Sequence, residues 1–331
     1  MTKKNILSCI QPTGQIHLGN YLGAIQNYVK LQADYECVYG VVDYHAMTMP
    51  YNPEELKKNT LNMVIALVAC GVNIENIFVQ SLVPEHTELA WILGCVCAYN
   101  ELTRQTQFKD KSNQLEENTS GTFITSGLFT YPVLQAADIL MYHPHFVPVG
   151  KDQEQHIELS RNVANRFNYQ FQTEYFPEPK SLFTEIPKVL SLADPSKKMS
   201  KSLGEKHCLF LFEEESTLRK KIKTAVTDVG DTPEGQMSPG VENLFSIIKA
   251  LGNQALYDSL MQEYLTTGKM YGKLKEGVAE TVVPFTNQLK EKRNEVLEDK
   301  DFLEKVRHSS AEIRKKAQKT LREVREITGL M

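Results

Sequence analysis

The fold of this chain is most constrained by a regular alternation of short apolar runs and helix-like patterns over residues 5–82. Three apolar runs have the length and β-propensity of strands: residues 5–10, 37–42 and 77–82. Helical spacing of apolar residues separates these runs, first over residues 20–31 and then over residues 53–70. Because a helix that joins two strands returns the chain in the same direction, this order predicts a parallel sheet covered by helices.

A change in pattern divides the chain. Residues 87–105 have a further helical pattern, and residues 109–121 are polar, as in a loop. After Ser202 the strand-like runs nearly disappear, and helical patterns follow at residues 213–226, 241–251, 281–297 and 309–327. We therefore expect an α/β domain over residues 1–203 and a smaller α-helical domain over residues 204–331. The last helix is a candidate to pack back on the first domain.

The composition is that of a globular protein, with 41% hydrophobic residues and a net charge of −4. This charge provides no field that would attract nucleic acid to the whole surface, so any nucleic-acid surface must be local. The most apolar stretch, residues 61–74, is too short to span a bilayer, and the N-terminal apolar run is too short for a secretory signal. Six cysteines without a Cys-x-x-Cys pair fit reduced thiols. We expect a cytoplasmic protein with no membrane partner.

The turn after the first strand is one candidate site. Residues 12–20 read Pro-Thr-Gly-Gln-Ile-His-Leu-Gly-Asn and match neither the dinucleotide fingerprint nor the Walker P-loop. A turn that ends at a helix N-terminus presents free backbone N–H groups to an anion, and Gly19 would let the ligand approach the backbone. His17 and Asn20 would add donors for a phosphate that gains charge in a transition state. An ordinary turn with a surface histidine would have the same spacing.

A second candidate site is the sequence Lys-Met-Ser-Lys-Ser at residues 198–202, in a polar loop at the expected domain change. Lysines flanked by hydroxyl groups suit a leaving pyrophosphate. A solvated basic loop is the alternative interpretation.

Together, these two motifs resemble the two signatures of class I aminoacyl-tRNA synthetases. Further blocks are similar to the bacterial tryptophanyl-tRNA synthetase family: residues 10–14, 43–46, 131–140 and 148–156. The resemblance implies a Rossmann-like parallel sheet domain and a smaller helical C-terminal domain that reads the anticodon. It also implies ATP-dependent ligation of L-tryptophan to tRNA(Trp) through a tryptophanyl adenylate, by a homodimer.

The resemblance also implies the residues of the amino-acid pocket. Tyr131, Gln135 and Asp138 have the spacing of one helix face. By resemblance, the Asp138 carboxylate accepts the indole N–H, while Tyr131, Gln135 and Gln153 bind the α-ammonium group. The expected lining residues are Leu7, Cys9, His45, Tyr131, Gln135, Asp138, Ile139, Val147, Val149 and Gln153. Asp138 could instead be exposed or capped locally, and His45 could be structural.

The ATP site follows from the same resemblance. The residues expected around ATP are Gln11, Thr13, Gly19, Asn20, Gly150, Asp152, Lys198, Met199, Ser200, Lys201 and Lys111, with Lys109 as a further candidate. His17 and Asn20 would act at the α-phosphate, and Lys198 and Lys201 at the leaving pyrophosphate. Asp152 would accept a ribose hydroxyl, although a helix cap fits its position as well.

No resident metal is expected. Magnesium should enter only with ATP, held mainly by the phosphates. Some tryptophanyl enzymes carry an iron–sulfur cluster on cysteines that follow the Lys-Met-Ser-Lys-Ser loop. In this chain Cys208 is the only cysteine there, so we expect no cluster.

Two other functions stay open from the sequence: a tyrosine–tRNA ligase of similar layout and a nucleotide-binding paralogue without catalysis. The spacing of Tyr131, Gln135 and Asp138 also occurs in tyrosyl enzymes. However, Leu7 stands where those enzymes carry a tyrosine that binds the substrate hydroxyl, and Asn20 stands where they usually carry histidine. Both differences favour tryptophan. Intact motifs and a long helical region argue against the paralogue. Leu7 and Gln135 also replace the Phe and Met that are frequent in bacterial tryptophanyl pockets.

A basic segment near the C-terminus is a local candidate for RNA binding. Residues 304–325 contain eight basic and three acidic residues, a net charge of +5. Such a segment can neutralise RNA phosphates. A solvated amphipathic helix that packs Ile313, Leu321 and Val324 would fit the same residues.

Overall fold

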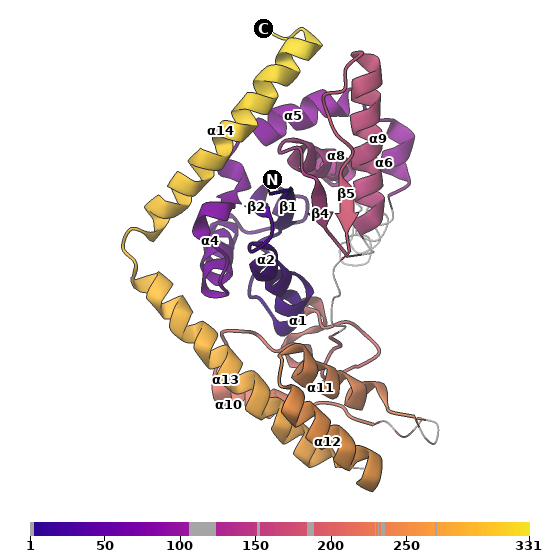
Figure 1. Ribbon diagram of the computed structural model, residues 1–331, viewed down its shortest axis with the longest axis vertical. Coiled ribbons are helices and arrows are strands. Elements are labelled where there is room, and N and C mark those ends of the chain that lie inside the picture. The colour runs from indigo at the N-terminus through magenta and orange to yellow at the C-terminus, as the bar shows by residue number, and fades with distance from the viewer. Residues whose placement is uncertain are drawn as a thin grey trace.

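The computed structural model describes residues 3–105, 124–150, 153–183, 189–228, 230, 232, 236–268 and 270–331. These residues form a five-stranded sheet with parallel pairings in the order β3-β2-β1-β4-β5. The strands are β1 (Asn5–Ile10), β2 (Glu36–Val41), β3 (Ile77–Val79), β4 (Phe146–Pro148) and β5 (Lys180–Leu182). Helices surround this sheet (Figure 1). The predicted α/β class with a parallel sheet is confirmed.

Alternation along the central strand supplies the two cores of the sheet. Ile6 belongs to one cluster of buried apolar residues and its neighbour Leu7 to another, because successive side chains of a strand point to opposite faces. The strands approach closely at Gly40. A Cβ atom there would lie 2.7 Å from the Phe78 ring and 2.9 Å from Cys9 Sγ, so a side chain at this position would collide with both neighbouring strands.

Helices connect and cover the strands. They are α1 (Leu18–Asn20), α2 (Gln26–Leu31), α3 (Asp43–Ala46), α4 (Pro53–Ala69), α5 (Glu85–Gly94), α6 (Tyr99–Thr103), α8 (Ser126–Leu140) and α9 (Glu154–Gln170). A short π-helix at Tyr21–Ile25 joins α1 to α2, so the predicted helical run is continuous. α4 begins as predicted at Pro53, where the Asn52 side chain accepts hydrogen bonds from two backbone N–H groups.

Two predicted elements in this region are wrong in extent. The single helix expected over residues 87–105 is interrupted, because Ala98 adopts an extended backbone (φ −77°, ψ 130°) immediately before α6. The strand expected over residues 77–82 ends at Val79, and a 3-10 turn follows at Gln80–Leu82. This turn carries the Gln80 side chain into the core, where it is completely buried.

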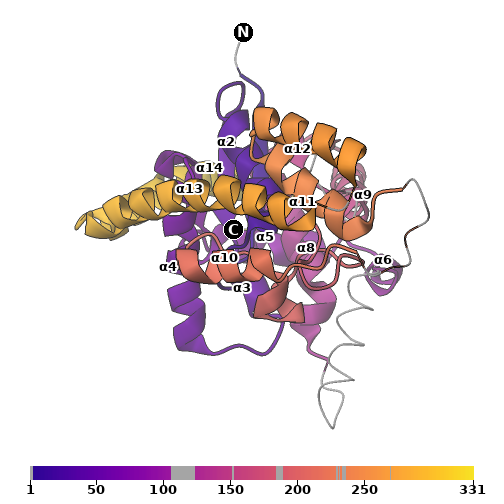
Figure 2. The same cartoon turned by 90° about the horizontal axis from the view of Figure 1, so that it is seen from below.

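The second half of the chain is helical, as predicted. Its helices are α10 (Glu215–Lys223), α11 (Pro239–Ala250), α12 (Gln254–Thr267), α13 (Tyr271–Glu298) and α14 (Phe302–Thr328). The sequence patterns identified all of these except α12. α10 to α13 gather at one end of the molecule (Figures 1 and 2). No helix within the described ranges has an apolar stretch long enough to cross a membrane.

α14 runs back along the α/β part and covers the edge strand β3 (Figure 1). Two adjacent serines bind this edge. The Ser309 hydroxyl donates to the backbone oxygens of Ile74 and Ile77, at 2.7 and 2.6 Å, and Ser310 Oγ accepts from the Val79 N–H at 3.2 Å. The helix therefore satisfies backbone groups that an edge strand would otherwise expose.

Candidate active site

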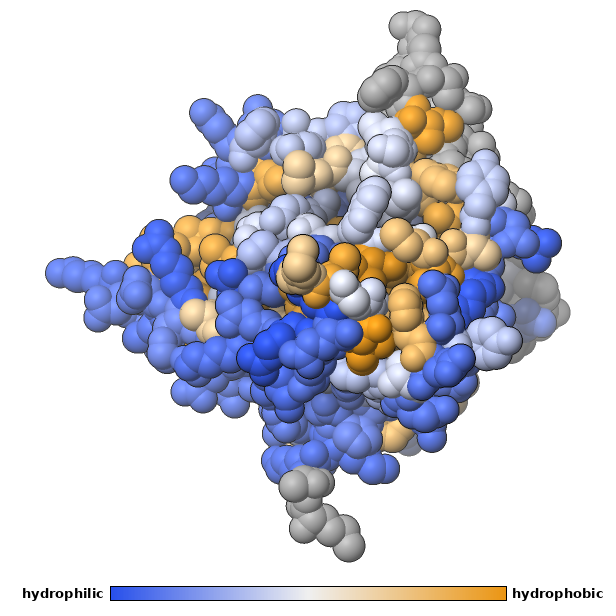
Figure 3. Space-filling model, turned by 90° about the horizontal axis from the view of Figure 1, so that it is seen from above, coloured by the Kyte–Doolittle hydropathy of each residue, from blue (hydrophilic) through white to orange (hydrophobic). Residues whose placement is uncertain are grey.

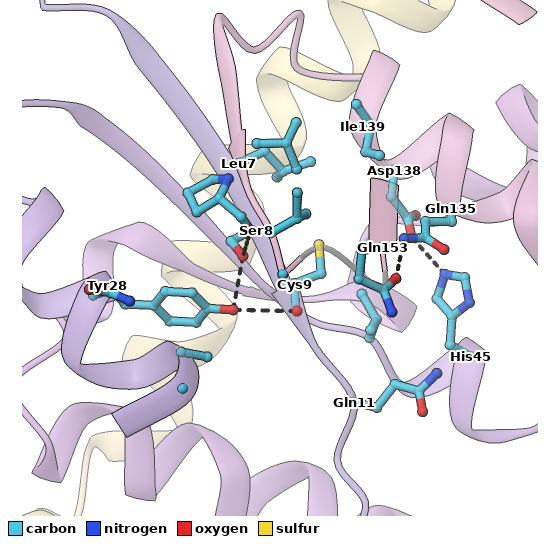
Figure 4. Close-up of a pocket in the computed structure, with 18 of the residues that line it drawn as sticks. Leu7, Ser8, Cys9, Gln11, Tyr28, His45, Gln135, Asp138, Ile139 and Gln153 are labelled. Carbon is cyan, nitrogen blue, oxygen red and sulfur yellow. Dashed lines mark hydrogen bonds and ion pairs between the residues drawn. The ribbon is translucent and has the colours of Figure 1, made fainter. Parts of the chain in front are cut away.

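A cavity of about 460 Å³ opens at the carboxyl ends of β1, β2 and β4, where open α/β sheets bind ligands. It contains every residue predicted for the amino-acid pocket: Leu7, Cys9, His45, Tyr131, Gln135, Asp138, Ile139, Val147, Val149 and Gln153. Gln11 and Gly150, predicted for ATP, line the same cavity. The structure thus brings together side chains from widely separated parts of the sequence (Figure 4).

Among the described residues that line this cavity, Asp138 is the carboxylate, and only 2% of it is exposed. His45 Nε2 lies 2.7 Å from its Oδ2 atom, and Gln80 Nε2 lies 2.8 and 2.9 Å from its two oxygens. His86 Nδ1 lies 2.7 Å from Oδ1. Burial alone would raise the pKa of Asp138, but the hydrogen bonds from both histidines lower it to about 2. The carboxylate is therefore ionised at neutral pH, and the alternative of an exposed or locally capped Asp138 is wrong.

A group of polar side chains lies near Asp138. Tyr131 Oη is 3.1 Å from His156 Nε2, and His156 Nδ1 is 3.1 Å from Gln153 Oε1. Gln135 Nε2 donates to the same Gln153 oxygen at 3.5 Å. Burial raises the pKa of Tyr131 to about 12, so its hydroxyl keeps its proton. His156 was not predicted, although its position three residues after Gln153 in the sequence was a usable signal.

Two residues of the cavity wall formed by β1 and α2 were not predicted as site residues. Ser8 Oγ donates to Tyr28 Oη at 2.9 Å, and Tyr28 stacks on Tyr39 with ring centroids 4.4 Å apart. Ser8 and Tyr28 both line the cavity. Burial raises the pKa of the Tyr28 hydroxyl and that of the Cys9 thiol, so both groups stay protonated at neutral pH. The helical spacing of Tyr28 indicated a core residue only.

The first motif is ordered by its own side chains. His17 precedes α1, and its Nδ1 atom accepts the backbone N–H of Asn20 at 3.2 Å. Asn20 Oδ1 accepts the His17 N–H in return, also at 3.2 Å. Burial, and then the charge of Lys201, lower the pKa of His17 to about 4. The ring is therefore neutral at pH 7, with its proton on Nε2, and His17 is 7% exposed, not a surface histidine.

The second motif lies against the first. The Lys201 ammonium group donates to the backbone oxygen of Thr13. Backbone hydrogen bonds also join the chain after this motif to the first turn, from Leu18 N–H to the Leu209 oxygen at 2.8 Å and from Leu211 N–H to the Ile16 oxygen at 3.0 Å. The structure thus places a lysine of residues 198–202 beside the turn that carries His17.

Close packing of the two motifs explains why residue 19 of the first motif is glycine. A Cβ atom at Gly19 would lie 3.0 Å from His17 Nδ1 and 3.4 Å from Met199 Cβ. Met199 is buried, whereas Lys198 and Lys201 are exposed. Ser200 is half-buried, with its Oγ atom 2.9 Å from Ser202 Oγ. Three predicted ATP contacts are outside the described residues: Lys109, Lys111 and Asp152.

Comparison with known proteins gives the family. The model of the family described as class I tRNA synthetases (W and Y) matches residues 2–287. A tryptophanyl-tRNA synthetase from Mycoplasma pneumoniae is 33% identical, with a TM-score of 0.88, and the match covers 100% of this chain and 99% of that one. This chain belongs to the class I tRNA synthetases of the W and Y type.

Two further solved structures are similar to this synthetase to different degrees. The tryptophanyl-tRNA synthetase from Campylobacter jejuni, complexed with ADP and tryptophan, is 33% identical with a TM-score of 0.84, over 98% of this chain and 100% of that one. A tyrosyl-tRNA synthetase from Archaeoglobus fulgidus, complexed with L-tyrosine, is 17% identical with a TM-score of 0.66, over 88% and 90% of the two chains. The second likeness shows the shared fold alone.

The basic segment of this synthetase forms part of α14. Ion pairs join seven of its basic side chains to acidic ones: Lys305–Asp299, Arg307–Glu304, Arg314–Glu85, Lys315–Glu312, Lys316–Glu36, Lys319–Glu323 and Arg325–Glu88. Ile313, Leu321 and Val324 are buried. The amphipathic-helix interpretation is therefore confirmed, while RNA binding by this helix stays a prediction. Among the described residues, no three His, Cys, Asp or Glu side chains are grouped to hold a metal ion.

Proposed function

We propose that this synthetase activates L-tryptophan with ATP and transfers it to tRNA(Trp). The observation that carries the proposal is the buried, ionised Asp138 in a cavity whose other wall residues include Leu7, Ile139 and Val147. A flat apolar slot with one charged acceptor fits an indole ring with a single N–H donor. The full-length likeness to two tryptophanyl-tRNA synthetases supports the same substrate.

Activation needs no nucleophile from the protein. The carboxylate oxygen of tryptophan attacks the α-phosphorus of ATP, a new P–O bond forms, and the bond to the leaving pyrophosphate breaks. The 3′-terminal ribose hydroxyl of the tRNA then attacks the carbonyl carbon of the adenylate and releases AMP. Magnesium enters as part of the ATP substrate, held mainly by phosphate oxygens.

The two motifs supply donors to the phosphates. We assign His17 Nε2–H and the Asn20 amide to the α-phosphate, because His17 is neutral and its other ring nitrogen already accepts a hydrogen bond. Lys198 and Lys201 would stabilise the charge that develops on the pyrophosphate. Lys201 already lies beside the first turn, where its ammonium group donates to a backbone oxygen. When ATP binds, a phosphate oxygen would take the place of that backbone oxygen as the acceptor.

The other expected partners extend this proposal. We assign residues 204–331 to anticodon recognition, with the domain division after residue 203, and we place the enzyme in the cytoplasm, where tRNA is charged.

We also propose a homodimer. An apolar patch lies on the end of the molecule that carries α5 and the C-terminus of α14, as Figure 3 shows, and such patches mark association surfaces.

Charging of tRNA tests the proposed function. With labelled amino acids, the enzyme should acylate a tRNA(Trp) transcript with tryptophan and should acylate neither tRNA(Trp) nor a tRNA(Tyr) transcript with tyrosine. Charging of tRNA(Tyr) with tyrosine would assign the chain to the tyrosyl enzymes. If neither transcript is charged and neither amino acid supports exchange of pyrophosphate into ATP, the chain is a non-catalytic paralogue.

A further inference from the structure

A second layer of side chains lies behind the cavity wall at Asp138. Three donor atoms approach its carboxylate, from His45 on α3, Gln80 after β3 and His86 on α5. Of these three, only His45 lines the cavity. Gln80 and His86 are both completely buried, so they reach the carboxylate from the protein side. Neither residue was predicted from the sequence.

The His86 ring has little freedom to move. It stacks on Phe78 with the ring centroids 5.3 Å apart and an interplanar angle of 14°. Its Nε2 atom lies 2.9 Å from Tyr142 Oη, while Nδ1 lies 2.7 Å from Asp138 Oδ1. Contacts on the ring face and at both nitrogens therefore fix its orientation.

Charge determines which nitrogen of His86 carries the proton. An ionised carboxylate can only accept hydrogen bonds, and at 2.7 Å two lone pairs would repel each other, so Nδ1 carries the proton. The N–H direction misses the line to Oδ1, so this is a close electrostatic contact and not a well-formed hydrogen bond. Burial, and then the charge of Asp138, raise the pKa of Tyr142, so its hydroxyl stays protonated. When the ring carries this single proton, Nε2 accepts from the Tyr142 hydroxyl, and this bond favours the tautomer whose Nδ1–H faces Asp138.

The orientation of the His86 ring is important because the Asp138 carboxylate has few acceptor positions. A carboxylate has about four lone-pair positions. Three hydrogen bonds from His45 and Gln80 occupy most of them. His86 Nδ1 lies against Oδ1, and the direction of the remaining position decides where a substrate N–H can bind. A rotation of the carboxylate would direct that position away from the cavity.

We propose that His86, held by Tyr142, is a positioning residue for amino-acid recognition. It orients the Asp138 carboxylate so that an acceptor position faces the N–H group of the substrate ring. The inference rests on the proposed function, since it concerns the same pocket. It assigns to His86 an effect on amino-acid binding and no effect on ATP binding, because neither motif of the ATP site contacts it.

Two polar substitutions of His86 separate positioning from simple packing. The amide nitrogen of asparagine reaches the place of Nδ1, whereas that of glutamine reaches the place of Nε2. His86→Asn keeps a donor to Asp138, and His86→Gln keeps only the bond to Tyr142. In tryptophan-dependent exchange of pyrophosphate into ATP, His86→Gln should raise the KM for tryptophan about 10-fold, which is about 1.4 kcal/mol. His86→Asn should stay within about 3-fold of the wild type, and the KM for ATP should change in neither variant.

Tyr142→Phe is a milder variant for the case that neither His86 variant folds. It removes only the hydroxyl group that holds the tautomer, and it should raise the KM for tryptophan by about 3-fold to 10-fold without changing the KM for ATP. Thermal unfolding of each variant measures the structural effect separately. Equal KM values for tryptophan in His86→Asn and His86→Gln would overturn the inference, and so would an unchanged KM in Tyr142→Phe. A wild-type enzyme that shows no exchange with tryptophan would instead contradict the proposed function.

Discussion

Replacing Asp138 by asparagine should raise the dissociation constant of tryptophan about 10-fold to 100-fold and leave the affinity for ATP unchanged. The substitution keeps the shape of the side chain but removes its charge and one of its acceptor oxygens. A hydrogen bond to a charged acceptor is worth about 1.5 to 3 kcal/mol, which corresponds to this loss of affinity. ATP should be unaffected because its donors, His17 and Lys201, belong to the other part of the site.

The same substitution should destabilise the fold. The carboxylate is 2% exposed, and three side chains direct donors at it. An amide converts one acceptor into a donor, so at least one buried N–H group loses its acceptor. This loss should lower the free energy of unfolding by about 1 to 3 kcal/mol. Alanine would leave all three donors without this acceptor, so asparagine is the more informative change.

Calorimetric titration of tryptophan and of ATP tests the prediction, and urea denaturation measures stability separately. Asp258→Asn is a matched control, because Asp258 is an exposed carboxylate on α12 that accepts one hydrogen bond, from Gln254 at 2.8 Å. The control should bind both ligands like the wild type. If folded Asp138→Asn protein binds tryptophan within a factor of about two of the wild type, Asp138 does not accept the indole N–H.

Three further predictions concern other parts of the molecule. His17 should titrate near pH 4 by NMR, and because its pKa is below the ordinary 6.5, the free energy of unfolding should fall as the pH drops from 6.5 to 4; a midpoint near 6.5 would contradict its burial. Lys201→Ala should slow adenylate formation about 100-fold in single-turnover experiments without changing tryptophan affinity, and an unchanged rate would remove Lys201 from the phosphate site. Ser310→Ala should lower the free energy of unfolding by about 1 to 3 kcal/mol in urea, because the Val79 N–H loses its acceptor, and unchanged stability would contradict that bond.

The sequence predicted the parts of the fold that depend on local patterns. Strands β1 and β2 and helix α4 lie within a residue or two of their predicted ranges, because apolar runs and the Asn-Pro start are local signals. The short strand β5 was not predicted, since Lys180–Leu182 has no pattern that distinguishes it from a loop. α13 begins ten residues before the predicted start at residue 281, because two of the buried positions in its first turns are Gly277 and Thr281, which are not strongly apolar.

The candidate site was predicted where a motif marks it and missed where only tertiary contacts create it. Resemblance placed Asp138 and His45 in the pocket, and both line the cavity. It gave no reason to select Gln80 or His86, which reach the same carboxylate from the other side. A polar residue at the end of a buried strand, such as Gln80, was the available signal. The stacking of His86 on Phe78 depends on the packing of α5 and could not be inferred from spacing.

Exchange of labelled pyrophosphate into ATP tests the central claim most directly, because it reports amino-acid activation without tRNA. With purified enzyme and Mg·ATP, L-tryptophan should support exchange, and L-tyrosine at the same concentration should support it at least about 100-fold less efficiently, since the pocket offers Leu7 and no hydroxyl partner in that position. Comparable or greater exchange with tyrosine would contradict the assignment of tryptophan as the substrate. No exchange with either amino acid would contradict the proposal that the two motifs form a working site.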